Sequence, residues 1–180
     1  PGVEGIPMSA SSRHTAADVA RRHEALKHRT EGLLDRFEKH TYTHTDGKEM
    51  PYRLFRPHAA ASGGNLPLVI FLHGLGGKGT DNVGQLADQP VGPCLWAMEE
   101  HQAQYPCYVL APQSSGYGRF MCWTEQVLPA AKALADAIVA EHPIDADRIY
   151  ITGISMGGFG TWGMLALYPD FFAAAVPVCG

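Results

Sequence analysis

Residues 147–169 read DRIYITGISMGGFGTWGMLALYP, and this stretch predicts a strand that turns abruptly into a helix. The apolar, β-branched run 149–152 is typical of a buried strand, and residues 156–168 predict a helix that ends before a proline. Ser155 stands at the junction, where the chain leaves the C-terminal end of the strand. Ligands bind at that edge of open α/β sheets, so Ser155 is a candidate functional residue.

Ser155 has a glycine two positions away on either side, in the pattern G-x-S-x-G. A serine on so tight a bend takes a strained backbone conformation, and a side chain at Gly153 or Gly157 would collide with the turn. The helix that begins at Met156 directs free N–H groups at the serine, as the oxyanion of a tetrahedral intermediate requires. We therefore expect Ser155 to be a nucleophile and the Met156 N–H to be an oxyanion donor. The alternative is a glycine-rich turn in which the serine only caps the helix.

A second glycine-rich turn, HGLGG at 73–77, follows another apolar run, LPLVIFL at 66–72. A continuous apolar run of this kind is typical of a strand buried on both faces. Taken alone, the turn is also consistent with an anion-binding nest. A phosphate-binding P-loop is disfavoured because residues 77–80 lack the full GxxxxGK[ST] pattern. Two such turns, each after a buried strand, indicate a single site at one edge of a parallel sheet.

The rest of the chain alternates predicted strands and helices. The expected segments are a surface helix from 15 to about 38, a hairpin of 40–45 and 50–56, a helix near 94–104, a strand at 107–111, a helix at 128–142, a turn at 145–147 and a strand at 173–178. Buried strands that alternate with helices of 10–15 residues predict βαβ units with helices on both faces. The fold class is therefore α/β: a three-layer α/β/α sandwich with a mainly parallel sheet and a leading antiparallel hairpin.

Composition excludes several classes of protein. The 180 residues are 46% hydrophobic and 18% charged, with a net charge of −4, so neither nucleic acid nor an anionic membrane is an expected partner. No apolar run approaches the roughly 20 residues that span a bilayer. The four cysteines, at 94, 107, 122 and 179, lack metal-binding spacing, and we expect no metal. The first residue is Pro1 and no signal peptide is visible, so we expect the start of the gene product to be absent. The compartment stays open, with a secreted or periplasmic location favoured.

The motifs resemble those of the α/β-hydrolase superfamily. More narrowly, the chain is similar to the esterase group once labelled predicted peptidases, which is related to polyhydroxybutyrate-depolymerase and feruloyl-esterase-like enzymes. The matching stretches are residues 66–82, 105–113, Trp123 and 147–180. The likeness covers about residues 40–180, so it implies an α/β-hydrolase domain at 39–180 after an N-terminal tail and surface helix at 1–38.

The resemblance implies a role for five residues. Ser155 would be the nucleophile, and the N–H groups of Leu75 and Met156 would form the oxyanion hole. Gln113 and Trp123 would lie near the substrate cleft, the alternatives being a polar loop residue and a core aromatic. No metal or organic cofactor is implied.

The sequence departs from the family pattern in its catalytic partners. The α/β-hydrolase order is Ser, then Asp or Glu, then His. Only Asp170 is acidic after Ser155, and it falls before the strand that should precede the acid loop, so it is not assigned. The nine histidines, at 14, 23, 28, 40, 44, 58, 73, 101 and 142, all precede Ser155. His73 is expected to brace the oxyanion loop rather than to act as a base. We therefore expect a C-terminal segment with the Asp and His to be missing, and the 180-residue chain alone to be inactive.

Together these features predict a serine carboxylic-ester hydrolase that acts through an acyl-enzyme on Ser155. The resemblance suggests short or aromatic acyl esters, as small molecules or as decorations on a polysaccharide. One alternative is a serine peptidase on the same fold. Another is an inactive binding module or fragment that keeps the serine turn but lacks its partners.

Overall fold

The computed structural model describes residues 15–115 and 123–180 of the chain. One six-stranded sheet runs through this part in the order β1-β2-β4-β3-β5-β6. The strands are β1 Glu38–Thr43, β2 Glu49–Phe55, β3 Leu66–Leu72, β4 Tyr108–Pro112, β5 Ile144–Ile154 and β6 Ala174–Val178. Strands β3 to β6 pair in parallel, whereas β1 and β2 form an antiparallel hairpin that joins the sheet through β4. The predicted fold class, a mainly parallel sheet with a leading hairpin, is confirmed.

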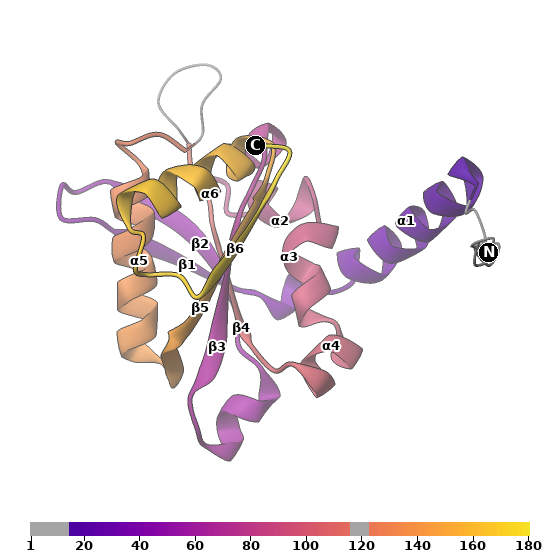
Figure 1. The fold of residues 1–180 in the computed structure, drawn as a ribbon, viewed down its shortest axis with the longest axis horizontal. Coiled ribbons are helices and arrows are strands. Elements are labelled where there is room, and N and C mark those ends of the chain that lie inside the picture. The colour runs from indigo at the N-terminus through magenta and orange to yellow at the C-terminus, as the bar shows by residue number, and fades with distance from the viewer. Residues whose placement is uncertain (1–14, 116–122) are drawn as a thin grey trace, which may run out of the picture.

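Helices cover both faces of this sheet (Figure 1). The α-helices are α1 Ala16–Glu31, α2 Gly84–Ala87, α3 Val91–Cys94, α4 Glu99–Gln104, α5 Leu128–Glu141 and α6 Met156–Leu167. Short 3-10 turns occur at η1 Leu34–Arg36, η2 His58–Ser62, η3 Leu75–Gly77 and η4 Leu95–Ala97. Helices α5 and α6 lie on one face, and α2, α3 and α4 lie on the other (Figure 1). The sheet is the middle layer of a three-layer sandwich.

The central strands are apolar throughout because they are buried on both faces. In β3, Leu68, Ile70 and Leu72 belong to the larger hydrophobic cluster, which also contains residues of α5 and α6. Val69, which points the other way, belongs to a second cluster that includes Leu86 of α2. Side chains alternate between the faces of a strand, so a run such as LPLVIFL supplies both cores at once.

Three segments differ from their expected form. The helix expected near 94–104 is broken into α3, η4 and α4. Met98 has an extended backbone (ψ 140°), so η4 ends before it and α4 begins after it. The N-terminal helix ends at Glu31, followed by Gly32 and the short η1 turn, rather than near residue 38. The turn expected at 145–147 lies inside β5, whose pairing with β3 shifts register at its start.

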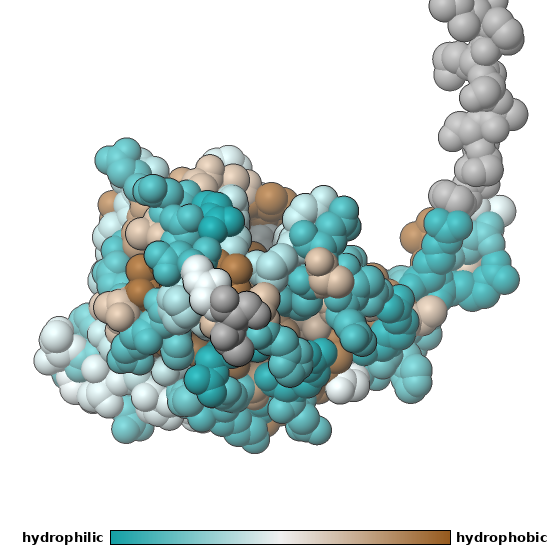
Figure 2. Space-filling view, turned by 90° about the horizontal axis from the view of Figure 1, so that it is seen from below, coloured by the Kyte–Doolittle hydropathy of each residue, from teal (hydrophilic) through white to brown (hydrophobic). Residues whose placement is uncertain are grey.

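Helix α1 projects from the body of the molecule (Figure 1). Its surface is largely hydrophilic in the view from below (Figure 2). A capping box starts it: Thr15 Oγ1 accepts the Asp18 N–H, and the Asp18 carboxylate accepts the Thr15 N–H. No helix in residues 15–115 and 123–180 is both long and apolar enough to cross a membrane. The tail expected at the start of the chain lies outside the described residues.

Candidate active site

Ser155 lies between β5 and α6 with a backbone conformation that serine rarely adopts. Its φ is 55° and its ψ is −116°, and its side chain is exposed. The bend is held by its own backbone: the Ser155 N–H donates to the Val178 carbonyl (2.8 Å), and its carbonyl accepts the Phe159 N–H (3.1 Å). Among the described residues, the Oγ has no hydrogen-bond partner. A strained residue that presents a free hydroxyl at a strand end is typical of a functional site.

The two glycines of the G-x-S-x-G pattern are required by close backbone contacts. A Cβ atom on Gly157 would lie 1.8 Å from the Leu72 carbonyl oxygen, and one on Gly153 would lie 2.4 Å from the Gly157 carbonyl oxygen. Both contacts are far shorter than van der Waals distance. Glycine at these positions therefore allows α6 to start directly against β3, which places Ser155 beside the loop that follows β3.

That loop carries the second glycine-rich turn. A Cβ atom built on Gly74 would lie 3.7 Å from the Cβ of Ser155 and 3.4 Å from the Ile154 carbonyl oxygen, so the two turns are in contact. Residues far apart in the sequence thus meet at the C-terminal edge of the parallel strands, where the sequence predicted a single site.

The orientation of the Gly74–Leu75 peptide is fixed by hydrogen bonds to its carbonyl oxygen. The Gly74 carbonyl accepts hydrogen bonds from His73 Nδ1 (2.7 Å) and from the Gly77 N–H (3.2 Å). In a trans peptide the carbonyl and the following N–H point in opposite directions, so the Leu75 N–H points away from these partners. Among the described residues, neither the Leu75 N–H nor the Met156 N–H has an acceptor. Two unpaired N–H groups beside a free hydroxyl can stabilise an oxyanion.

His73 is a structural brace in this arrangement. Its side chain is 1% exposed, and Nε2 accepts the Ser114 N–H at 3.0 Å, which leaves Nδ1 as the donor to Gly74. Its ring packs on Trp123 with 4.9 Å between ring centroids. Burial lowers the pKa of His73 to about 4, so the imidazole is neutral at pH 7. With both ring nitrogens engaged, His73 has none left for Ser155.

The other two expected site residues, Gln113 and Trp123, are both buried. Trp123 is 3% exposed, and its Nε1–H donates to the His73 carbonyl oxygen (2.9 Å). Gln113 is 1% exposed, and both N–H bonds of its amide are used within the protein. Trp123 packs behind His73, and Gln113 bonds to the loop after Leu75, while their expected place near a substrate cleft stays a prediction.

No acid–base partner of Ser155 is present in the described part of the chain. None of the histidines in residues 15–115 and 123–180 forms a hydrogen bond with the Ser155 side chain, and Asp170 lies in the turn between α6 and β6, before β6 begins. Those same ranges hold no group of three or more His, Cys, Asp or Glu side chains placed to bind a metal. Cys94, Cys107 and Cys179 are free thiols, and Cys122 lies outside the described residues.

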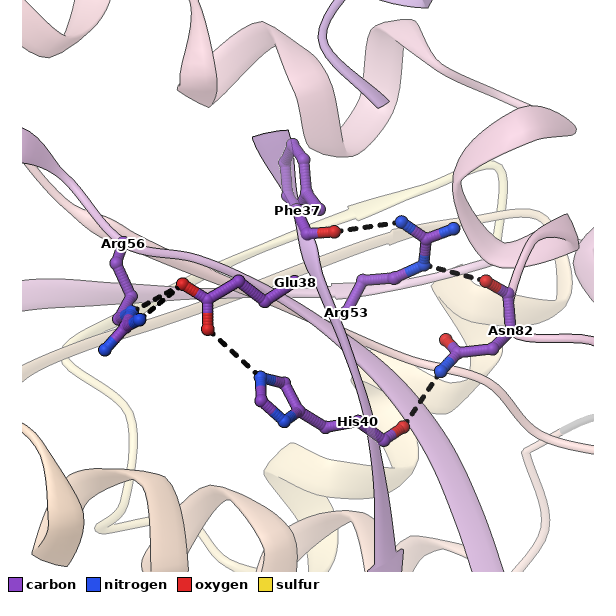
Figure 3. A network of polar contacts seen from close by, with 6 residues as sticks. All are labelled: Phe37, Glu38, His40, Arg53, Arg56 and Asn82. Carbon is purple, nitrogen blue, oxygen red and sulfur yellow. Dashed lines mark hydrogen bonds and ion pairs between the residues drawn. The ribbon is translucent and has the colours of Figure 1, made fainter. Parts of the chain in front are cut away.

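One apolar cavity is separate from Ser155. It has a volume of about 520 Å³ and lies against β3, β5 and β6, with Trp96 and Tyr105 at its rim. Its lining is mostly apolar and does not include the Ser155 turn. Two further residues, missed by the sequence analysis, hold the loop after Leu75. Arg53 and Asn82 bond to each other (Figure 3), and the Asn82 N–H donates to Gln113 Oε1. No spacing in the sequence links these positions, because β2, β4 and the loop meet only in the folded chain.

Comparisons with known proteins agree with this fold. The model of the prolyl oligopeptidase family matches residues 122–180. A solved structure of a thermostable esterase is 41% identical, with a TM-score of 0.74 over 82% of the chain. Poly(3-hydroxyalkanoate) depolymerase C of Paucimonas lemoignei is 49% identical over 49 residues, or 27% of the chain. The feruloyl esterase module of Clostridium thermocellum, complexed with sinapinate, shares the fold at 18% identity, with a TM-score of 0.62 over 79% of the chain and 53% of that module.

The strand order, the helices on both faces and the serine at the β5–α6 junction define an α/β-hydrolase fold. The chain has this fold, as its motifs predicted, and over 82% of its length it is similar to an esterase of known structure. It covers 42% of the length of the thermostable esterase, and its match covers 12% of the depolymerase.

Proposed function

We propose that this chain carries the nucleophile and the oxyanion hole of a serine carboxylic-ester hydrolase. The observation that carries the proposal is the unpaired Ser155 hydroxyl, held at φ 55° beside the free N–H groups of Leu75 and Met156. A lone serine hydroxyl is a weak nucleophile, so this geometry supplies the position and the charge stabilisation but not the proton transfer.

In the proposed reaction, Ser155 Oγ attacks the ester carbonyl and its proton passes to a histidine. The carbonyl oxygen becomes an oxyanion, which accepts hydrogen bonds from the Leu75 and Met156 N–H groups. Collapse of the intermediate breaks the ester C–O bond, the histidine protonates the departing alcohol, and Ser155 retains the acyl group. Water, deprotonated by the same histidine, then releases the acid and restores the hydroxyl.

We propose that the histidine and its acidic partner come from chain that follows β6. Two observations support this placement. No histidine of the described residues reaches Ser155, and the relatives of this fold are longer, since the chain covers only 42% of the thermostable esterase. The order Ser, acid, His of α/β-hydrolases is consistent with such an origin. On this proposal the 180 residues alone turn over slowly or not at all.

The substrates that we propose are short or aromatic acyl esters, including those that decorate polysaccharides. The likeness to an esterase and to a polyester depolymerase supports an ester rather than an amide bond. One finding favours a peptidase instead, namely the match of residues 122–180 to the prolyl oligopeptidase family. Hydrolysis of p-nitrophenyl acetate, compared with that of a peptide p-nitroanilide, separates the two because an amide needs its leaving amine protonated by the histidine.

The test is labelling by a fluorophosphonate probe, with the modified residue identified by mass spectrometry. It uses the 180-residue chain and a longer product of the same gene that extends beyond Gly180. We expect the longer product to be labelled at Ser155 and the 180-residue chain to be labelled weakly. Ser155→Ala should lower ester turnover by about a thousandfold or more.

Ser115→Ala is the matched control, because it removes another exposed hydroxyl at the same edge of the sheet. It should leave both labelling and turnover unchanged. Labelling of a different residue, or turnover that survives Ser155→Ala, would overturn the proposed site. A longer product that is not labelled would favour the inactive binding module.

A further inference from the structure

A single buried amide holds three points of the loop that follows the oxyanion turn. Gln113, at the end of β4, donates from Nε2 to the Gly77 carbonyl (3.0 Å) and to Asp81 Oδ1 (2.7 Å). Its Oε1 accepts the Asn82 N–H (2.6 Å). Gln113 is 1% exposed, and its bond to the Gly77 carbonyl is buried. One side chain therefore holds residues 77–82 at three points, and the Gly79 N–H adds a backbone bond to the Ser114 carbonyl (3.1 Å).

Asn82 extends this contact towards the hairpin. It is one of the few described non-glycine residues with positive φ (55°), a conformation that asparagine tolerates better than most. Its Nδ2 donates to the His40 carbonyl of β1 (2.9 Å), and its own carbonyl accepts Arg53 Nε (2.7 Å) (Figure 3). The side-chain oxygen accepts Gln85 Nε2 (2.6 Å). Asn82 thus links the loop to both strands of the hairpin.

Arg53 completes the network as a buried cation held by carbonyl oxygens. It is 5% exposed, and Nη1 donates to the Phe37 carbonyl (2.9 Å) in addition to the Nε contact with Asn82 (Figure 3). Among the described residues, no carboxylate forms an ion pair with it. A guanidinium stays charged when buried, and removing one of its acceptors leaves a costly unpaired donor. The network therefore favours a single arrangement of the loop.

The anchored loop is continuous with the peptide that carries the second oxyanion donor. Within the η3 turn, the Gly77 N–H donates to the Gly74 carbonyl and the Lys78 N–H donates to the Leu75 carbonyl, each at 3.2 Å. The Gly77 carbonyl, at the end of this turn, is the atom that Gln113 holds. A displacement of Gly77 therefore rotates the turn and re-aims the Leu75 N–H.

We propose that Gln113, Asn82 and Arg53 are positioning residues that fix the Leu75 N–H in the oxyanion hole, an inference that rests on the proposed function. They touch neither substrate nor Ser155. Their effect is confined to the step in which negative charge develops on the carbonyl oxygen. Loss of a whole oxyanion donor lowers kcat by about 10²–10³-fold, so a misaligned donor should cost about 10-fold or more, with KM changed less than about threefold.

The experiment compares Gln113→Met and Asn82→Gly in the longer gene product that contains the chain. Gln113→Met removes the amide and keeps an apolar side chain of similar length. Asn82→Gly keeps the backbone, including the bond from its carbonyl to Arg53, and removes only the side-chain bonds. The matched control is Gln102→Met, because Gln102 also joins a loop by its amide, at the Trp96 and Cys107 carbonyls near the opposite end of β4.

Steady-state kinetics with p-nitrophenyl acetate are combined with hydrogen–deuterium exchange of the peptide that spans residues 73–84. We expect Gln113→Met to lower kcat at least about 10-fold and to speed exchange in that peptide, Asn82→Gly to do so less, and Gln102→Met to change kcat less than twofold. The proposal is overturned if exchange speeds up while kcat stays within twofold of wild type. It is also overturned if Gln102→Met lowers kcat as much as Gln113→Met does. Its failure is separable from that of the proposed function, because the wild-type protein must first show turnover that Ser155→Ala abolishes. If Gln113→Met does not fold, Asn82→Gly alone decides, and unchanged kcat in that variant overturns the proposal.

Discussion

At the scale of single residues, the proposed function depends on backbone atoms that side chains hold in place. The two proposed oxyanion donors are peptide N–H groups, and His73, which orients one of them, does not contact substrate in the proposed reaction. The sequence predicted Ser155 and the bracing role of His73 because glycine and histidine are distinctive at a strand end. It did not predict the roles of Asn82 and Arg53, because an asparagine in a loop and an arginine in a strand have many uses.

The burial of neutral His73 makes folding stability depend on pH. Its folded pKa of about 4 lies below the ordinary value of 6.5, so its contribution is fully present above pH 6.5 and is lost as pH falls towards 4. Lowering the pH from 7 to 4.5 should therefore remove about 2 kcal/mol of unfolding free energy through this one group. Urea unfolding of the 180-residue chain at the two pH values measures it.

The control for this prediction is His73→Gln, which lacks the titrating group while the other histidines remain. It should be less stable than wild type at pH 7 and should lose about 2 kcal/mol less on acidification. An equal loss in the two proteins would show that His73 is not the group responsible.

At the scale of elements, strands were predicted better than helices. The runs in β3 and β5 are apolar because both faces are buried. Such a run predicts a buried strand whatever its register with the neighbouring strands. The segment expected as one helix near 94–104 failed because Met98 is extended, and nothing in its own residue type requires that break. The start of α6 was predicted closely because Gly153 and Gly157 mark a contact between backbones.

The packing of α6 against β3 predicts a large effect of one methyl group. Gly157→Ala would place a Cβ atom 1.8 Å from the Leu72 carbonyl oxygen, and neither backbone can move without displacing the Ser155 bend. We expect unfolding to become easier by about 3 kcal/mol or more, measured by urea denaturation.

Gly32→Ala serves as the control for Gly157→Ala. A Cβ at Gly32, which has a helical backbone, would meet only the Arg29 carbonyl oxygen at 3.7 Å, so this change should be neutral or slightly stabilising. Comparable stability of the two variants would contradict the proposed close contact.

At the scale of the whole molecule, the sheet of the described residues ends in an apolar edge. There β6 pairs only with β5, and its Val176 is 61% exposed. Exposed aromatic side chains of α6, Phe159 and Trp162, add apolar surface. Edges of this kind pair with other chains unless charge or covering chain prevents it.

We therefore expect the 180-residue chain to self-associate at high concentration, and Val176→Lys to shift it towards monomer. Analytical ultracentrifugation over a range of concentrations measures this shift. Val83→Lys, which places the same charge at an exposed loop valine, should leave association unchanged. Equal behaviour of the two variants would mean that the β6 edge is not the contact.

The Gly74 and Gly77 carbonyls each accept a hydrogen bond from a buried side chain, that of His73 and that of Gln113. On the proposed function, these bonds assemble the receptor for the transition state during folding, so the entropy of ordering it is lost before an ester binds. Binding of a tetrahedral transition-state analogue should therefore show a single fast phase, without a slow conformational step. Its affinity should come from the preorganised donors rather than from the area of contact.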